Sequence, residues 1–187
     1  MQITGIILSG GQSTRMGTDK ALLQINGKTL LENAIDICKP YCQTIIISSN
    51  KSGHELFGHE IIPDEIKNCG PLGGIYSCLK KSDTDWNFII SVDAVFVEPE
   101  FVRFLISEIG DFDAIIPVHK NGKEPLIAMY HKNCIPAIET SINSGDFKMQ
   151  NFLGKINVNE INSSTWLQKY PRLFLNLNRP GDLNFSE

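Results

Sequence analysis

The sequence predicts an α/β fold with a mainly parallel central sheet. Short apolar runs recur along the chain, and segments with apolar residues at helical spacing separate them. Runs that are apolar at almost every position suit strands covered on both faces. Alternation of strand and helix favours parallel strands joined by right-handed crossovers. The length of 187 residues suits one domain, 1–187.

The expected strands are rich in isoleucine, valine and aromatic residues, which favour a buried, pleated backbone. They are Ile3–Leu8, Gln43–Ser48, Glu60–Pro63, Trp86–Val92, Ala114–Val118 and Leu126–Tyr130, with a final strand-like run at Leu173–Leu177.

The expected helices lie between these strands. One carries Leu30, Leu31, Ala34, Ile35 and Cys38 on a single face, and Pro40 marks its end. Two more carry the apolar sets Leu72, Ile75, Tyr76 and Leu79, and Phe101, Phe104, Leu105 and Ile109. Past Pro136 the pattern weakens into short helices.

Composition excludes several classes of protein. A formal net charge of −4 argues against binding to duplex nucleic acid, which needs a positive surface. The apolar run at Ile3–Leu8 is too short for a signal segment or a membrane span. The five cysteines form no C-x-x-C pair. We therefore expect a reduced, cytoplasmic protein with no membrane partner.

The most informative segment follows the first strand directly and runs from Leu8 to Lys20. Its adjacent glycines, Gly10 and Gly11, allow a tight turn whose N–H groups can cradle anionic oxygens. Arg15 and Lys20 add positive charge. Open α/β folds bind ligands at the carboxyl ends of their strands, which is where this segment falls. A flexible surface turn with incidental charges is the alternative.

Two common nucleotide-binding motifs are excluded. The P-loop ends in G-K-[ST], as Gly27-Lys28-Thr29 does, but its first glycine would be at position 22, which is Leu22. Gly10, Gly11 and Gly17 do not have the spacing of the dinucleotide fingerprint.

The segment from Leu8 to Lys28 resembles the signature of the molybdenum cofactor guanylyltransferases, L-[AS]-G-G-x-S-x-R-M-G-x-D-K-x-L-L. Further matches in the same order are Gly70-Pro71-Leu72-Gly73-Gly74, Ser91-Val92-Asp93, Glu124-Pro125-Leu126-Ile127-Ala128 and the closing Asn176 to Leu183. The resemblance implies a Rossmann-like three-layer sandwich of the nucleotide-diphospho-sugar transferase type. It divides the chain into a nucleotide-binding part of about 1–100 and an acceptor-binding part of about 101–187.

The resemblance also implies roles for individual residues. Asp93 would hold Mg²⁺, which phosphoryl-transfer sites bind through one or two carboxylates and phosphate oxygens. Arg15, Lys20 and Asp93 would be the catalytic residues, with the two cations stabilising charge on the triphosphate. The nucleotide-binding set comprises Leu8, Ser9, Gly10, Gly11, Lys20, Asn50, Asp64, Gly73, Gly74 and Asp93.

Structural alternatives stay open for these residues. Asp93 can cap the next helix, and Asp64 can be an ordinary turn residue. Gly73 and Gly74 either let the base approach the backbone or serve helix–sheet packing. The family's N-A-N pattern can also be aligned on Ser48 instead of Asn50.

One departure concerns the residues after Asp93. The family usually has proline two residues after this aspartate, whereas Ala94-Val95-Phe96 follows here. The shape of that turn is therefore in question, although the carboxylate is present.

The acceptor-binding candidates are Asn176 and Asn178. On a strand these residues would face one way, and their amides can both donate to a phosphate and accept from a pterin N–H. Their alternative role is to close backbone hydrogen bonds near the chain end.

The implied reaction transfers GMP from GTP to the terminal phosphate of molybdopterin and releases pyrophosphate. The implied partners are GTP and molybdopterin or molybdenum cofactor, with room for transient contact with cofactor-biosynthesis or acceptor proteins. The alternatives are a cytidylyltransferase or another nucleotidyltransferase of the same superfamily, and a non-catalytic nucleotide-binding module.

Overall fold

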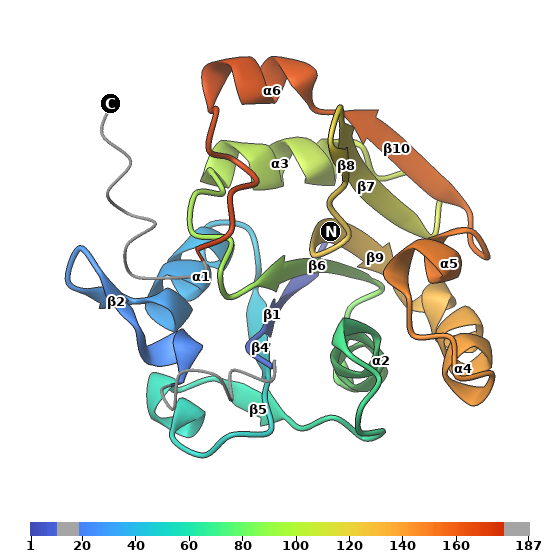
Figure 1. Ribbon diagram of the computed structural model, residues 1–187, viewed down its shortest axis with the longest axis horizontal. Helices are drawn as coiled ribbons and strands as arrows, with labels where there is room; N and C mark the ends of the chain where they lie inside the picture. The colour runs from blue at the N-terminus through green and yellow to red at the C-terminus, as the bar shows by residue number, and fades with distance from the viewer. Residues whose placement is uncertain (11–18, 178–187) are drawn as a thin grey trace.

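A computed structural model describes residues 1–10 and 19–177 of the chain. Its centre is an eight-stranded sheet, shown in Figure 1, with the strand order β10-β7-β9-β6-β1-β4-β5 and with β8 paired to β7. These strands are β1 (Ile3–Leu8), β4 (Thr44–Ser48), β5 (Glu60–Ile62), β6 (Trp86–Ser91), β7 (Ala114–His119), β8 (Gly122–Lys123), β9 (Ile127–His131) and β10 (Val158–Asn162).

The sheet is mainly parallel, as the apolar runs predict. β5, β4, β1 and β6 run in one direction, and Leu8 lies level with Ser48 on one side and Ser91 on the other. β9 runs against both neighbours, pairing Ile90 with Ile127 and Ile115 with Met129. The start of β9 therefore lies at the same edge of the sheet as the end of β6.

Helices cover both faces of the sheet and complete three layers (Figure 1). One apolar cluster packs α1 (Leu30–Cys38) and α3 (Pro99–Ser107) on one face, with α6 (Ser164–Lys169) against them. The other cluster packs α2 (Pro71–Lys81), α4 (Ile135–Asn143) and α5 (Met149–Leu153) on the opposite face. Alternation along β1 sends Ile7 to the first cluster and Ile6 to the second. The expected three-layer α/β sandwich is confirmed.

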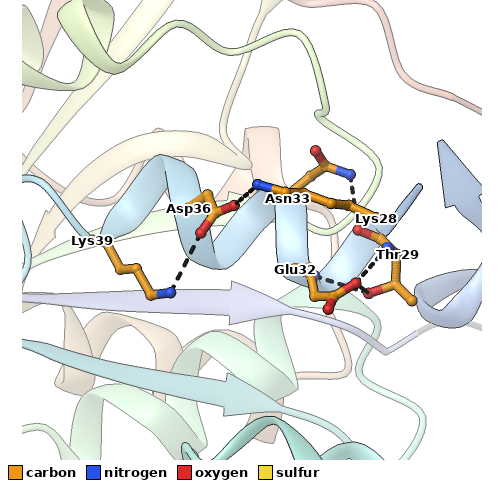
Figure 2. A network of polar contacts seen from close by, with 6 residues as sticks. All are labelled: Lys28, Thr29, Glu32, Asn33, Asp36 and Lys39. Atoms are coloured by element: carbon orange, nitrogen blue, oxygen red, sulfur yellow. Dashed lines mark hydrogen bonds and ion pairs between the residues drawn. The ribbon is translucent and has the colours of Figure 1, made fainter. Parts of the chain in front are cut away.

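The start of α1 follows from its sequence. A hairpin of β2 (Gln24–Ile25) and β3 (Lys28–Thr29) precedes it, and Asn26 and Gly27 take the positive φ of 51° and 81° that its turn requires. Thr29 then caps the helix. Its side chain accepts from the Glu32 N–H, and the Glu32 carboxylate accepts from the Thr29 N–H, which forms the capping box in Figure 2.

The predicted strand at Leu173–Leu177 is wrong. The backbone there forms turns, with the Leu173 N–H bonded to the Tyr170 carbonyl and the Leu175 N–H to the Arg172 carbonyl. A strand would put Leu175 on the same face as the buried Leu173 and Leu177, but Leu175 is 40% exposed. Asn176 therefore does not lie on a strand, and Asn178 lies outside the described residues.

The strand β10 at the edge of the sheet is not among the predicted strands. Val158 and Ile161 are its apolar residues, and β10 pairs with β7 alone. An edge strand covered on one side needs few apolar positions, so its sequence carries little strand signal.

Within residues 1–10 and 19–177, none of the helices has the length and apolar character needed to cross a bilayer.

Candidate nucleotide-binding site

A cavity of about 680 Å³ opens at the carboxyl edge of the parallel strands. Its volume falls in the usual range for small-molecule sites. Residues at or just after the ends of β1, β4, β5 and β6 meet there with the start of α2. The lining residues are Leu8, Gly10, Ser48, Asn50, Lys51, Asp64, Lys67, Asn68, Gly70, Pro71, Gly74, Ser91 and Leu126.

The structure brings Lys20 and Asp93 into direct contact, although the two residues are far apart in the sequence. Lys20 Nζ lies 2.7 Å from Asp93 Oδ2, and the Ser91 hydroxyl donates to Asp93 Oδ1 at 2.5 Å. The Lys20 and Asp93 side chains are 21% and 18% exposed, so the ion pair is partly shielded from solvent. Ser91 lines the cavity, whereas Lys20 and Asp93 do not, so the pair lies beside the cavity, behind Ser91.

The turn after Asp93 is compact without the family's proline. The Ala94 N–H donates to the Ser91 carbonyl at 3.0 Å, and Ala94 is buried. The Leu177 N–H donates to the Asp93 carbonyl at 3.0 Å, so the C-terminal segment is fastened to this turn. The backbone around Asp93 is therefore held on two sides, and its carboxylate faces Lys20.

Asp19 forms the centre of a second polar cluster. Its carboxylate accepts from the Ala21 N–H at 3.1 Å and so caps the short helix η2 (Lys20–Leu22). Lys51 Nζ lies 2.8 Å from Oδ1, and His54 Nε2 lies 2.8 Å from Oδ2. Burial raises the pKa of Asp19, but the hydrogen bonds from Lys51 and His54 outweigh it and leave the pKa below its ordinary value.

His54 also contacts Ser9, with 3.5 Å between Nδ1 and the Ser9 hydroxyl oxygen. His54 thus joins Ser9 and Asp19 in a Ser–His–Asp arrangement that no sequence motif predicts. His54 is fully buried and Ser9 nearly so. A nucleophile needs access to its substrate, so these buried contacts do not form a nucleophilic triad; they join Ser9 to Asp19 through His54.

Asn50 and Asp64 lie together at the wall of the cavity, as expected for residues that follow adjacent strands. Asn50 Oδ1 accepts from the Asp64 backbone N–H at 3.0 Å. This bond ties the end of β4 to the end of β5. Ser48, which the alternative alignment would choose, also lines the cavity.

The two glycines of α2 differ in what surrounds them. A Cβ on Gly74 would lie 2.5 Å from Ser48 Oγ and 3.4 Å from Asp64 Oδ1, and Gly74 lines the cavity. A Cβ on Gly73 would lie 3.0 Å from the Ile66 carbonyl oxygen. Helix packing thus accounts for Gly73, whereas Gly74 combines packing with a place at the cavity wall. Before them, Gly70 has a φ of 59° and lets the chain enter α2 at Pro71.

The [HE]-P-x-x-A motif, residues 124–128, lies where the chain enters β9, next to the end of β6. Glu124 precedes β9, and its Oε1 lies 2.8 Å from His119 Nε2 at the end of β7. The His119 ring stacks on Phe174 with 5.2 Å between ring centroids. The C-terminal segment therefore packs on the strand ends of the second half of the sheet before it reaches Asp93.

Three predicted site residues, Gly11, Arg15 and Asn178, lie outside the described residues. Asn176 is exposed, one residue before the bond to Asp93. Ser9 faces His54. Asp19, Lys51 and His54 are not among the predicted site residues, although they lie together near the cavity. Lys51 could have been found, because it directly follows Asn50 at the carboxyl edge. No spacing rule connects His54 with Asp19.

The residues present fit a magnesium ion that arrives with phosphate oxygens. Within the part of the chain that the structure describes, no three His, Cys, Asp or Glu side chains are grouped as a metal site would need. Mg²⁺ commonly uses one or two carboxylates with water and substrate phosphates. Asp93 supplies such a carboxylate beside the cavity.

The family model described as the MobA-like NTP transferase domain matches residues 5–160. The chain belongs to this family. A MobA-like relative from Pelotomaculum thermopropionicum, named probable molybdenum cofactor guanylyltransferase, is 32% identical over 98% of this chain and 91% of its own. The molybdenum cofactor guanylyltransferase of Vibrio campbellii is 30% identical over 97% of this chain and 93% of its own.

A solved structure shares the MobA-like fold over nearly the whole chain. Molybdopterin-guanine dinucleotide biosynthesis protein A from Archaeoglobus fulgidus superposes with a TM-score of 0.80 and 28% identity, covering 96% of this chain and 94% of that one. The resemblance that the motifs predict is thus confirmed, and the protein is a nucleotidyltransferase by family.

Proposed function

We propose that this MobA-like protein transfers GMP from GTP to the terminal phosphate of molybdopterin. A phosphate oxygen of the pterin attacks the α-phosphorus in line, the bond between the α-phosphorus and the bridging oxygen breaks, and pyrophosphate leaves. The Lys20–Asp93 pair beside a cavity large enough for a nucleotide carries the proposal. The names of relatives that match nearly the full chain support the choice of substrates.

Lys20 is proposed to stabilise the charge that develops on the phosphates. Its ammonium group is held at the end of β6 by Asp93, so it is oriented before the substrate binds. Preoriented charge in a partly buried site lowers the barrier because little reorganisation is needed during the reaction. Arg15 is proposed as a second cation.

Asp93 is proposed to hold Mg²⁺, with the Ser91 hydroxyl orienting the carboxylate. When bound, Mg²⁺ supplies positive charge to the phosphate oxygens and so assists departure of pyrophosphate. Lys20 shares this carboxylate, and its charge therefore stays close to the same phosphates.

The remaining assignments are part of the same proposal. Residues of about 1–100 bind the nucleotide and those of about 101–187 bind the acceptor, within one domain. Leu8, Gly10, Asn50, Asp64 and Gly74 contact GTP from the cavity wall, and Asn176 and Asn178 contact the pterin. All five cysteines are buried and unpaired, which suits a reducing cytoplasm.

The test is pyrophosphate release on addition of molybdopterin, with Mg²⁺ and with GTP, CTP, UTP or ATP. Release that requires both GTP and the acceptor is expected. Selectivity for CTP would favour the cytidylyltransferase alternative, and binding without release would favour the non-catalytic module.

The matched variants are Lys20→Ala and Lys28→Ala. Lys28 also forms an ion pair, 2.6 Å from Asp36, but both side chains are exposed; Lys28 lies on β3 and Asp36 on α1 (Figure 2). Lys20→Ala is expected to lower turnover about a hundredfold, and Lys28→Ala to leave it unchanged. Equal turnover of the two variants would refute the role of Lys20.

A further inference from the structure

The proposed reaction does not use the hydrogen-bonded series of side chains His54, Asp19 and Lys51. The His54 imidazole lies in the short helix η3 (His54–Phe57) after β4 and contacts both ends of the glycine-rich segment, Ser9 before it and Asp19 after it. With the proton on Nε2, the ring donates to Asp19 and accepts from the Ser9 hydroxyl, so one tautomer satisfies both contacts.

The exposed fraction of the side chain increases from His54 through Asp19 to Lys51, the residue at the cavity. The His54 side chain is 0% exposed, that of Asp19 is 16% exposed and that of Lys51 is 33% exposed. Lys51 is also the member of this ion-paired set that lines the cavity. The buried end therefore fixes the position of the series, and the exposed end presents a cation to a ligand.

The Asp19 carboxylate is well held. Both of its oxygens accept hydrogen bonds, one from His54 and the other from Lys51 and from the Ala21 N–H. A carboxylate fixed in this way holds the lysine in one place and lowers the entropy that Lys51 loses on binding. An ammonium group has three N–H donors, so pairing with Asp19 leaves donors for a phosphate.

The position of Lys51 favours the phosphate end of the cavity. Its partner Asp19 directly precedes Lys20, and Lys20 contacts Asp93. The residue before Lys51, Asn50, accepts a hydrogen bond from the Asp64 backbone N–H, and Asn50 and Asp64 also line the cavity. Lys51 thus lies on the wall between the two groups.

We propose that Lys51 binds phosphate oxygens of the nucleotide and that Asp19 and His54 are its positioning residues. The inference rests on the proposed function, because it takes a nucleoside triphosphate as the occupant of the cavity.

The test compares the affinities for GTP and guanosine, measured by calorimetry, in the full-length protein and its variants. Lys51→Ala is expected to weaken GTP binding about tenfold, or about 1.4 kcal/mol, and to leave guanosine binding unchanged. The control is Lys80→Ala, since Lys80 also lies 2.8 Å from a carboxylate, that of Glu65, but does not line the cavity. This control should retain both affinities.

Asp19→Asn separates positioning from simple neutralisation. If Asp19 positions Lys51, removing its charge weakens GTP binding. If Asp19 merely competes with phosphate for Lys51, removing its charge tightens GTP binding, and that result would overturn the proposal. In the double variant with Lys51→Ala, the two losses should not add, because Asp19 acts through Lys51.

His54 is tested by a pair of variants. His54→Gln can still donate to Asp19 and should keep the ratio of the two affinities, whereas His54→Leu should lower the preference for GTP over guanosine. An unchanged ratio in both His54→Leu and Lys51→Ala would refute the inference while leaving the proposed function intact. Failure of the unmodified protein to bind GTP would instead refute the proposed function and the inference with it.

Discussion

Replacing Gly74 with alanine tests whether the close packing of α2 on β4 shapes the nucleotide cavity. The new Cβ would lie 2.5 Å from Ser48 Oγ, far inside van der Waals contact, and 3.4 Å from Asp64 Oδ1 and from Leu8 Cδ2. Ser48 must turn away or the helix must shift, and each change alters the cavity wall that Gly74, Ser48, Asp64 and Leu8 share.

Two opposing terms give the magnitude. Overpacking a tight interior costs about 1–3 kcal/mol, whereas alanine stabilises a helix interior by about 1 kcal/mol relative to glycine. Gly74→Ala should therefore lower the free energy of unfolding by about 1 kcal/mol. In a Ser48→Ala background the remaining neighbours are at ordinary contact distance. There the same change should raise the free energy of unfolding by about 0.5–1 kcal/mol.

Urea unfolding of the four proteins in this cycle measures both effects, and calorimetry with GTP reports the change at the cavity. A Gly74→Ala protein that is more stable than the unmodified protein and binds GTP equally well would show that a Cβ at position 74 fits between α2 and β4 without displacing either. The steric argument would also fail if Ser48→Ala brought no relief.

Three further predictions concern stability and reactivity. Thr29→Ala, which removes the cap of α1 (Figure 2), should lower the free energy of unfolding by about 1 kcal/mol in urea, while Lys28→Ala should have little measurable effect because its ion pair is exposed. The thiols should resist alkylation at pH 8 until the protein unfolds, since burial raises the pKa of Cys78 to about 12; fast native labelling would contradict this. The pKa of Asp19 is lowered in the folded state, so its contribution to stability is present above the unfolded pKa and is lost as pH falls through the folded pKa. Asp19→Asn should therefore flatten the acid limb of stability against pH, and an unchanged limb would contradict the assignment.

Sequence pattern predicts the central elements of the fold because their burial is complete. The strand Ile3–Leu8 has the predicted bounds, and the helix Leu30–Cys38 carries the predicted apolar set and ends before Pro40. The prediction fails where burial is partial. Leu173 and Leu177 are buried through turns, and the edge strand β10 needs few apolar residues. The antiparallel direction of β9 also could not be predicted, because an apolar run does not indicate the direction of a strand in the sheet.

The candidate site residues that can be predicted from sequence are those at strand ends or within recognisable motifs. Lys20 and Asp93 are found because one follows a glycine-rich segment and the other ends a strand, and the structure joins them at 2.7 Å. The His54–Asp19 contact is not predictable in this way. It depends on how η3 folds back beneath the end of β1, which is a property of tertiary packing and not of any local pattern.

The antiparallel strand β9 has a consequence for motion. It is hydrogen-bonded to β6 on one side and to β7 on the other, so the strand that bears Asp93 at its end and the strands of the C-terminal half form one sheet. Hinge closure of one half over the other would break those ladders. In the proposed reaction, loops and the substrates themselves would therefore have to exclude water.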